Sequence, residues 1–222
     1  MNGRHEYKYY INPSDYAQLR SRLRAIAKRD KNTDENGGYK IRSLYLDNYA
    51  DKLVSEKLAG VSRREKFRIR YYNNNIDFIR LEKKSKSNKL IYKESAILTK
   101  EQCSEILSGK YECLKTENVP LLTELYTKIH YQNLRAKSII DYDREVYIYP
   151  AGNVRVTIDS RIRMSSNVSG FLNPDLVMIP AANAIILEVK YDGFIPDVMR
   201  DILQINQRSR TEFSKYVVSR LV

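Results

Sequence analysis

Charged and apolar residues alternate with a period of two in several stretches of this chain, a spacing that predicts β-strands with one polar face. The clearest stretch is residues 66–71, KFRIRY. Lys66, Arg68 and Arg70 fall on one face of the expected strand, and the aromatic and aliphatic residues fall on the other. The same pattern returns at Arg4/Glu6/Lys8, Arg80/Glu82/Lys84, Arg155/Thr157/Asp159/Arg161 and Glu188/Lys190. It is weaker around Lys93 and Arg144.

The periodicity along the whole chain predicts an α+β fold. The short polar turns at 73–75 and 87–88 join three strands as consecutive antiparallel hairpins. Such a sheet can close into a barrel, which removes its edges, with the charged positions lining the interior and amphipathic helices packed outside. Strands are expected at 4–11, 39–47, 64–72, 76–86, 89–98, 134–149, 153–161 and 183–191, and helices at about 14–27, 50–58, 100–108, 119–131 and 196–207, with residues 212–219 closing the chain.

Length and charge narrow the class of protein. A chain of 222 residues without a Gly/Ser-rich or Pro-rich linker fits one domain over residues 1–222. The formal net charge of +12 favours polyanionic partners: nucleic acid, anionic membrane or phosphate-rich molecules. Because the charge lies in the strand-like segments and not in tails, it indicates a shaped site.

Nucleic acid is the weaker of these partners. The 18 tyrosines offer stacking surfaces. However, Tyr7, Tyr9 and Tyr71 fall on the strand positions opposite the cations and are interpreted as packing residues. Tyr72 and Tyr142 are the main exceptions.

The remaining composition excludes several kinds of chemistry. Cys103 and Cys113 follow neither a zinc-ligand nor a redox C-x-x-C spacing and are interpreted as free thiols of a reducing compartment. His5 and His130 are isolated, which argues against a histidine metal site or a Ser-His-Asp triad. No apolar signal segment or membrane-spanning stretch is evident, so we expect a soluble, cytoplasmic protein.

Carboxylates recur among the cations. Glu6, Glu82 and Glu188 each lie two positions before a lysine, and so share a strand face with it. A neutralising ion pair on a solvated face explains any single pair. The repeated set, rich in arginine, indicates instead a surface that grips phosphate or carboxylate oxygens. Mg²⁺ or Mn²⁺ held by one or two carboxylates and by substrate phosphates would suit this surface.

An ordered set of motifs resembles a known family. R-x-E-x-K-Y, S-L-Y-L-D, K-x-R-x-R-Y-Y, L-E-x-K, a lysine in the following strand, Y-D-R, V-R-V-T-I-D, L-E-V-K and F-S-K-Y follow one another between Arg4 and Tyr216. In this order they are similar to VTC domains, the polyphosphate polymerase domains of the triphosphate tunnel metalloenzyme (CYTH-like) superfamily. The resemblance implies an eight-stranded antiparallel β-barrel tunnel with a charged interior. It also implies a divalent cation, preferably manganese, and transfer of the γ-phosphate of ATP onto polyphosphate.

The resemblance also implies roles for individual residues. Glu188 would bind the metal, and Glu6 and Glu82 would assist it or orient basic neighbours, as could Asp159. Arg68, Arg70 and Arg155 would hold the triphosphate. The other phosphate-binding positions implied are Lys8, Lys84, Lys93, Arg144 and Lys215, with Lys66, Lys190 and Tyr142 as weaker candidates.

One position departs from the wider superfamily. The cyclase and thiamine-triphosphatase branch resembles E-x-E-x-K on its first strand, whereas this chain has Arg4 in place of the first acid. The change favours binding of a long phosphate chain over two-metal hydrolysis of a small triphosphate. Hydrolysis of tripolyphosphate or a nucleoside triphosphate and non-catalytic polyphosphate binding remain alternatives, and the oligomeric state is open.

Overall fold

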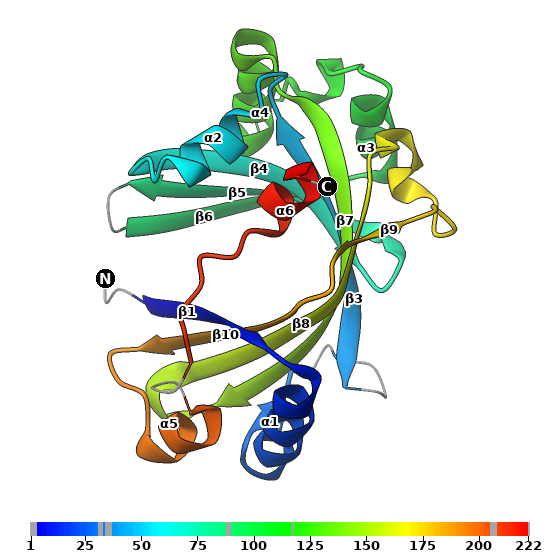
Figure 1. The fold of residues 1–222 in the computed structure, drawn as a ribbon. Coiled ribbons are helices and arrows are strands. Elements are labelled where there is room, and N and C mark those ends of the chain that lie inside the picture. The colour runs from blue at the N-terminus through cyan, green and yellow to red at the C-terminus, as the bar shows by residue number, and fades with distance from the viewer. Residues whose placement is uncertain are drawn as a thin grey trace. The chain divides into compact units, whose positions relative to one another are not determined.

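A computed structural model describes residues 4–30, 33, 37–87, 90–116, 118–204 and 208–221. Within these residues the chain forms one large β-sheet and six α-helices (Figure 1). The strands are β1 (Arg4–Ile11), β2 (Lys28–Arg29), β3 (Gly38–Asp47), β4 (Arg63–Tyr72), β5 (Asn75–Ser87), β6 (Leu90–Leu98), β7 (Arg135–Tyr149), β8 (Val154–Ser165), β9 (Ile179–Ala182) and β10 (Ile185–Asp192). The α-helices are α1 (Pro13–Ile26), α2 (Lys52–Leu58), α3 (Lys100–Leu107), α4 (Pro120–Gln132), α5 (Asp197–Leu203) and α6 (Lys215–Leu221).

The strand order corrects one expectation and confirms another. The hydrogen-bonded order is β1-β10-β8-β7-β3-β4-β5-β6, with β2 paired to β7 and β9 paired to β8. The α+β class is confirmed. The eight-stranded closed barrel is not found, because the described sheet has ten strands and its order ends at β1 and β6. The two unexpected strands, β2 and β9, are too short to produce an alternating sequence signal.

Contacts within the chain define two compact units. Unit 1 comprises Met1–Lys40, Tyr142–Ile162 and Ala182–Ser214, and unit 2 comprises Ile41–Asp141, Arg163–Ala181 and Lys215–Val222. Strands β3, β7, β8 and β9 contribute residues to both. Each unit is therefore assembled from distant chain segments. The expectation of one domain over residues 1–222 stays a prediction.

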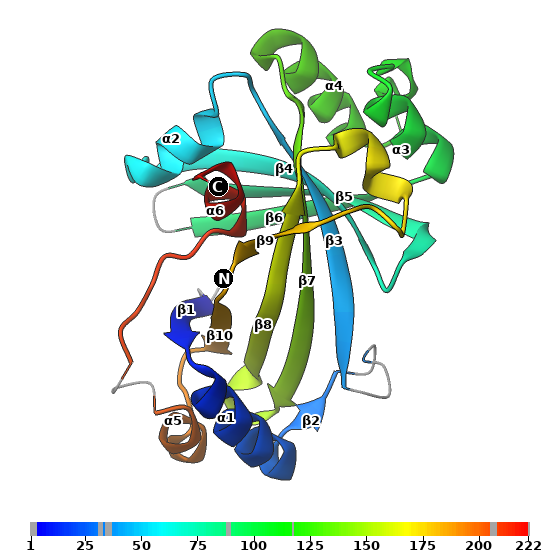
Figure 2. The ribbon, with the colours of Figure 1, turned by 45° about the vertical axis from the view of Figure 1, so that its right-hand side comes forward.

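Unit 1 is built on β1, β10, β8 and β7, with α1 and α5 packed beside one another (Figure 2). Helix α1 begins at a capping box, in which Asn12 and Asp15 each accept a hydrogen bond from the other's backbone N–H, and Pro13 fixes its first turn. Leu19 and Leu23 of α1 are buried with Met199 of α5 and the apolar positions of the strands. The other strand positions carry the charged residues.

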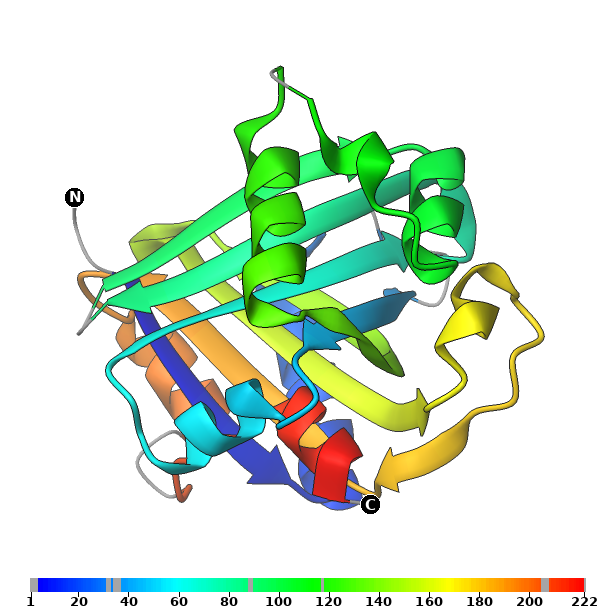
Figure 3. The ribbon, with the colours of Figure 1, turned by 90° about the horizontal axis from the view of Figure 1, so that it is seen from above.

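Unit 2 contains the antiparallel ladder of β3, β4, β5 and β6, with α3 and α4 over one face (Figure 3). Phe67, Ile69 and Tyr71 of β4 are buried in this core, as the alternation predicted. Helices α2 and α6 contact each other, and α2 contacts β4. The helix expected near 196–207 ends at Leu203, and residues 205–207 of that expectation lie outside the described residues.

Candidate functional site

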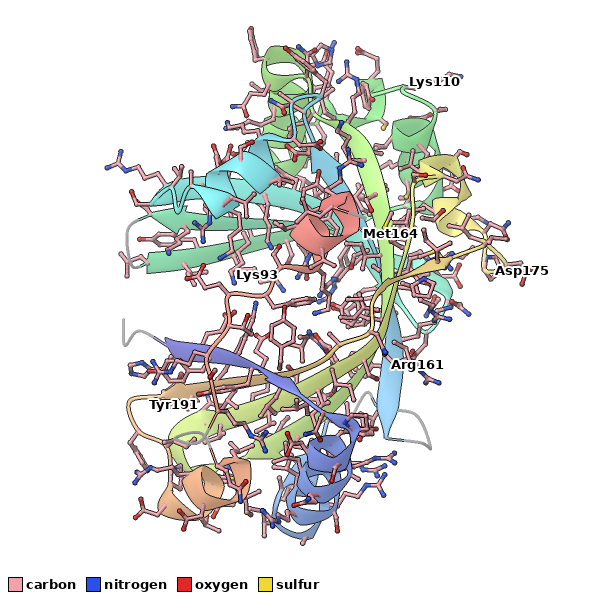
Figure 4. The ribbon with its side chains drawn as sticks, in the orientation of Figure 1. Lys93, Lys110, Arg161, Met164, Asp175 and Tyr191 are labelled. Carbon is pink, nitrogen blue, oxygen red and sulfur yellow. The ribbon has the colours of Figure 1, made fainter. Side chains whose placement is uncertain are left out.

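In unit 2, cations from β4 and β6 gather around one buried carboxylate of β5. We call this set, Tyr45, Lys66, Arg68, Arg70, Glu82 and Lys93, the β4 cluster. The ladder sets Arg68 beside both Tyr45 of β3 and Glu82 of β5. Lys93 of β6 lies on the face of these strands opposite α4 (Figure 4). The period-two spacing predicted this shared face.

Glu82 is the centre of the β4 cluster. Its Oε2 accepts a hydrogen bond from Arg68 Nε at 2.7 Å and lies 3.6 Å from Arg70 Nε. Its Oε1 lies 2.8 Å from Lys93 Nζ. Burial alone would raise the pKa of this carboxyl, but Arg68, Arg70 and Lys93 lower it to about 2. Glu82 therefore carries a full negative charge at neutral pH and holds three cations together.

Tyr45 is a second titratable group in contact with the cations of this cluster. Its ring is buried, and its hydroxyl accepts a hydrogen bond from Arg68 Nη1 at 3.5 Å. Lys66 Nζ lies 5.8 Å from the ring centroid. Burial would raise the pKa of the phenol, yet Arg68, Lys66 and Arg70 lower it to about 7. The cations around Tyr45 therefore favour the ionised form of its phenol.

The other predicted residues of unit 2 lie near this cluster in the fold. Lys84 of β5 is paired with Lys66 on one side and with Lys93 on the other. Lys215 is half-buried at the first position of α6, next to Tyr216, whose ring stacks on Tyr45. Lys84 thus borders the β4 cluster through the ladder, and Lys215 begins the helix whose Tyr216 packs on Tyr45.

In unit 1, two lysines and two glutamates form a second network. We call Glu6, Lys8, Glu188 and Lys190 the β1–β10 cluster. The ladder sets Glu6 opposite Lys190, and Lys8 opposite Glu188. Lys190 Nζ lies 2.8 Å from Glu188 and 3.6 Å from Glu6, and Lys8 Nζ lies 3.5 Å from Glu6. Burial would raise the pKa of Glu188, but Lys8, Lys190 and Arg144 hold it well below its usual value.

Arg144 extends this network along β7 and β8. It donates two hydrogen bonds to the fully buried Asp159, at 2.6 and 2.7 Å, and its guanidinium lies 5.3 Å from the ring centroid of Tyr142. Burial would lower the pKa of Arg144, but Asp159, Tyr142 and Glu188 raise it well above its ordinary value. Asp159 thus pairs with a basic neighbour, and the orienting role that the resemblance implies for it stays a prediction.

Arg155 is held by two residues that the sequence did not indicate. Its Nη2 donates to Asp30 Oδ2 at 3.0 Å and to the Tyr39 hydroxyl at 3.5 Å. Asp30 follows β2, a strand that sequence periodicity missed. Tyr45 was also missed, although it shares a strand face with Ser43 and Asp47, and that parity was visible in the sequence.

A divalent cation such as Mg²⁺ needs oxygen ligands from carboxylates and from substrate phosphates. Among the described residues no group of three or more His, Cys, Asp and Glu side chains is placed to hold a metal. Glu188 and Glu6 share Lys190, and Thr157 Oγ1, on the strand position opposite Glu188, is buried without a hydrogen-bond partner. Two carboxylates and a hydroxyl completed by phosphate oxygens fit Mg²⁺ or Mn²⁺. Both oxygens of Glu82 contact cations, an arrangement that suits an orienting role.

Comparison with known proteins gives a family and a fold. The sequence model of the family described as "VTC domain" matches residues 3–222. Among solved structures, a candidate adenylate cyclase from Bacillus halodurans is 14% identical, with a TM-score of 0.59 and coverage of 96% of this chain and 95% of that chain. A protein from Pyrococcus horikoshii is 13% identical, with a TM-score of 0.49 and coverage of 99% and 98%. No curated protein matches the chain.

No helix of the described ranges has the length and apolar character needed to cross a bilayer.

Proposed function

The chain belongs to the VTC domain family, and from this we propose that it is a metal-dependent phosphotransferase that lengthens polyphosphate with the terminal phosphate of a nucleoside triphosphate. ATP and inorganic polyphosphate are the proposed substrates. The family membership supports action on a triphosphate, and the side chains of the two clusters support the proposed phosphate binding.

The observation that carries the proposal is the excess of cations in the β4 cluster, where Lys66, Arg68, Arg70 and Lys93 accompany the single carboxylate of Glu82. Glu82 and Tyr45 both have depressed pKa values, about 2 and about 7, and the same two arginines, Arg68 and Arg70, contribute to both. Four cations and one carboxylate leave the β4 cluster with a net positive charge, which favours a multiply charged anion.

Each cluster has residues suited to a part of the reaction. Arginine offers planar, bidentate donors, so Arg68 and Arg70 are proposed to hold triphosphate oxygens in unit 2, and Arg155 is separately proposed to bind phosphate oxygens in unit 1. The other proposed phosphate-binding residues are Lys8, Lys66, Lys84, Lys93, Tyr142, Arg144, Lys190 and Lys215.

Positioning and charge neutralisation dominate phosphoryl transfer. A terminal oxygen of the acceptor polyphosphate attacks the γ-phosphorus, and the bond to the β–γ bridging oxygen breaks to release nucleoside diphosphate. An acceptor phosphate that is already ionised needs no protein base. The arginines and lysines would align the two anions and offset their repulsion.

Glu188 is the proposed metal residue, assisted by Glu6 and by the Thr157 hydroxyl, and Glu82 remains a weaker candidate. Lys190 would shift from the two carboxylates when they bind the cation. A bound Mg²⁺ or Mn²⁺ would neutralise charge on the phosphate oxygens.

The decisive experiment is incubation with ATP and Mn²⁺, followed by separation of products by size. A ladder of long phosphate chains is expected. Arg68→Gln should reduce it by a hundredfold or more, a loss of about 3 kcal/mol of transition-state stabilisation. Lys110→Gln removes the same charge at an exposed position after α3 and should leave it unchanged.

Other products would point to other functions. Free phosphate without chains would contradict the polymerase and support hydrolysis. Tight polyphosphate binding without turnover, unaltered by Glu188→Ala, would support a binding module.

A further inference from the structure

The guanidinium of Arg68 is contacted on two sides within unit 2. Glu82 Oε2 accepts its Nε–H at 2.7 Å, and the Tyr45 hydroxyl accepts its Nη1–H at 3.5 Å. The contacts come from β5 and β3, the two neighbours of β4. A guanidinium is planar, so contacts at Nε and Nη1 together define both its place and its orientation.

Tyr45 has little freedom of its own. The side chain is 3% exposed, and its ring stacks on Tyr216 of α6 with centroids 5.2 Å apart and an interplanar angle of 25°. Stacking of two buried rings restricts the χ1 rotation that would carry the Tyr45 hydroxyl away from Arg68. The place of Tyr216 therefore affects the place of the hydroxyl.

Tyr216 is anchored in turn to the end of β3. Its hydroxyl donates to Asp47 Oδ2 at 2.8 Å, and Asp47 is completely buried. Asp47 also accepts the backbone N–H of Asn48 at 2.8 Å and of Leu53, in the first turn of α2, at 3.1 Å. Asp47 thus joins α6, α2 and β3 at one point.

We propose that Tyr45 and Tyr216 are positioning residues that hold the Arg68 guanidinium in the orientation in which it binds phosphate. The inference rests on the proposed phosphate-binding role of Arg68. It makes α6, through Tyr216 and Asp47, part of the support of the anion site. Its components lie on four elements of unit 2: β3, β4, β5 and α6.

The arrangement also links anion binding to pH. Lys66, Arg68 and Arg70 of β4 act on the Tyr45 phenol, and Tyr216 of α6 stacks on its ring. Glu82 of β5 pairs with Arg68 and Arg70, and Lys93 of β6 pairs with Glu82. A neutral Tyr45 supports Arg68, whereas a tyrosinate at the same place is a fixed anion that competes with phosphate for it. Because the pKa of Tyr45 is about 7, the change falls near neutral pH.

The test uses the full chain, inorganic tripolyphosphate and isothermal titration calorimetry without turnover. Tyr45→Phe keeps the ring and removes the hydroxyl. At pH 6 it should weaken binding about three- to tenfold, the effect of one lost hydrogen bond. As pH rises through about 7, wild-type affinity should fall more steeply than that of Tyr45→Phe, so that the difference shrinks or reverses. Tyr216→Phe should give a smaller loss at pH 6.

The matched control is Tyr71→Phe. It removes another buried hydroxyl of unit 2, which donates to the Phe171 carbonyl at 2.7 Å, and should change stability without changing the pH profile of binding. A near-ultraviolet titration gives a readout that needs no ligand. Wild type should show one tyrosine ionising near pH 7, Tyr45→Phe should lack it, and Arg68→Gln should move it to higher pH.

The outcomes separate this inference from the proposed function. If Arg68→Gln loses tripolyphosphate but Tyr45→Phe matches wild type at every pH, the positioning role is overturned and the phosphate site stands. If the wild-type chain binds no tripolyphosphate, both fail, even if the titration shows coupling between Tyr45 and Arg68. A uniform loss at all pH values, shared by Tyr71→Phe, would also overturn the positioning role.

Discussion

At the residue scale, the site depends on carboxylates that keep cations together. Arg68, Arg70 and Lys93 would repel one another if Glu82 were absent, and Glu82 would be unstable as a buried anion without them. The sequence showed that Glu82 shares a strand face with basic residues. It could not show that one carboxylate serves three cations, because that depends on the register of β4, β5 and β6.

Glu82→Gln should destabilise the protein at pH 7. In the folded protein the pKa of this carboxyl is depressed from 4.5 to about 2, so its contribution is present above about pH 4.5 and is lost as pH falls toward 2. The depression corresponds to roughly 3 kcal/mol. Chemical denaturation between pH 2 and 7 should show a gap between wild type and variant that closes at acid pH.

Glu112→Gln is the control for this measurement. Glu112 forms an exposed pair with Lys115, and such solvent-screened pairs contribute little to stability. Its effect should be small at every pH. A Glu82→Gln variant that is equally stable at pH 7, or a gap that widens in acid, would contradict the assigned role of Glu82.

At the element scale, a buried ion pair ties β3 to β7 within unit 2. Arg42 donates to both oxygens of Asp141, at 2.9 and 3.0 Å, and both side chains are about 1% exposed. Arg42 also donates to the carbonyls of Phe171, in the 3-10 helix η3 (Val168–Leu172), and Asn173. One side chain thus holds two strands and the loop after β8. The sequence located these strands but gave no sign that Arg42 is internal.

Arg42→Met should cost about 3–5 kcal/mol, because it leaves Asp141 charged and buried without its partner. Arg42→Met with Asp141→Leu should recover much of the loss, since the uncompensated charge is gone. Urea denaturation of the two single variants and the double variant measures the coupling. Equal destabilisation by the double variant and the sum of the single variants would show that the pair does not act as a unit.

At the scale of the whole molecule, the sequence predicted the individual strands better than it predicted the pairing of distant strands. The eight expected strands are all present with ends shifted by a few residues, because alternation is a local property. The pairing of β1 with β10, whose residues lie far apart in the chain, is set by tertiary contacts and turn geometry. The sequence therefore could not predict that Lys8 lies opposite Glu188, although both are predicted site residues. The same holds for the contact of Arg155 with Asp30.

The charge of the whole chain leads to the last prediction. With a net charge of +12, the folded protein gains stability from any anion that binds it in preference to the unfolded chain. Tripolyphosphate at a hundred times its Kd should contribute about 2.7 kcal/mol and raise Tm by several degrees. Differential scanning fluorimetry should show the shift shrinking with added NaCl, because exposed charges are screened.

Sulfate at matched ionic strength should produce little of this Tm shift, since the proposed sites are built for several linked phosphates. Arg68→Gln should lower the shift more than Arg161→Gln, which removes a cation from an exposed position on β8 (Figure 4). Equal shifts with sulfate and tripolyphosphate, or in the two variants, would mean that the charge attracts anions without a shaped site.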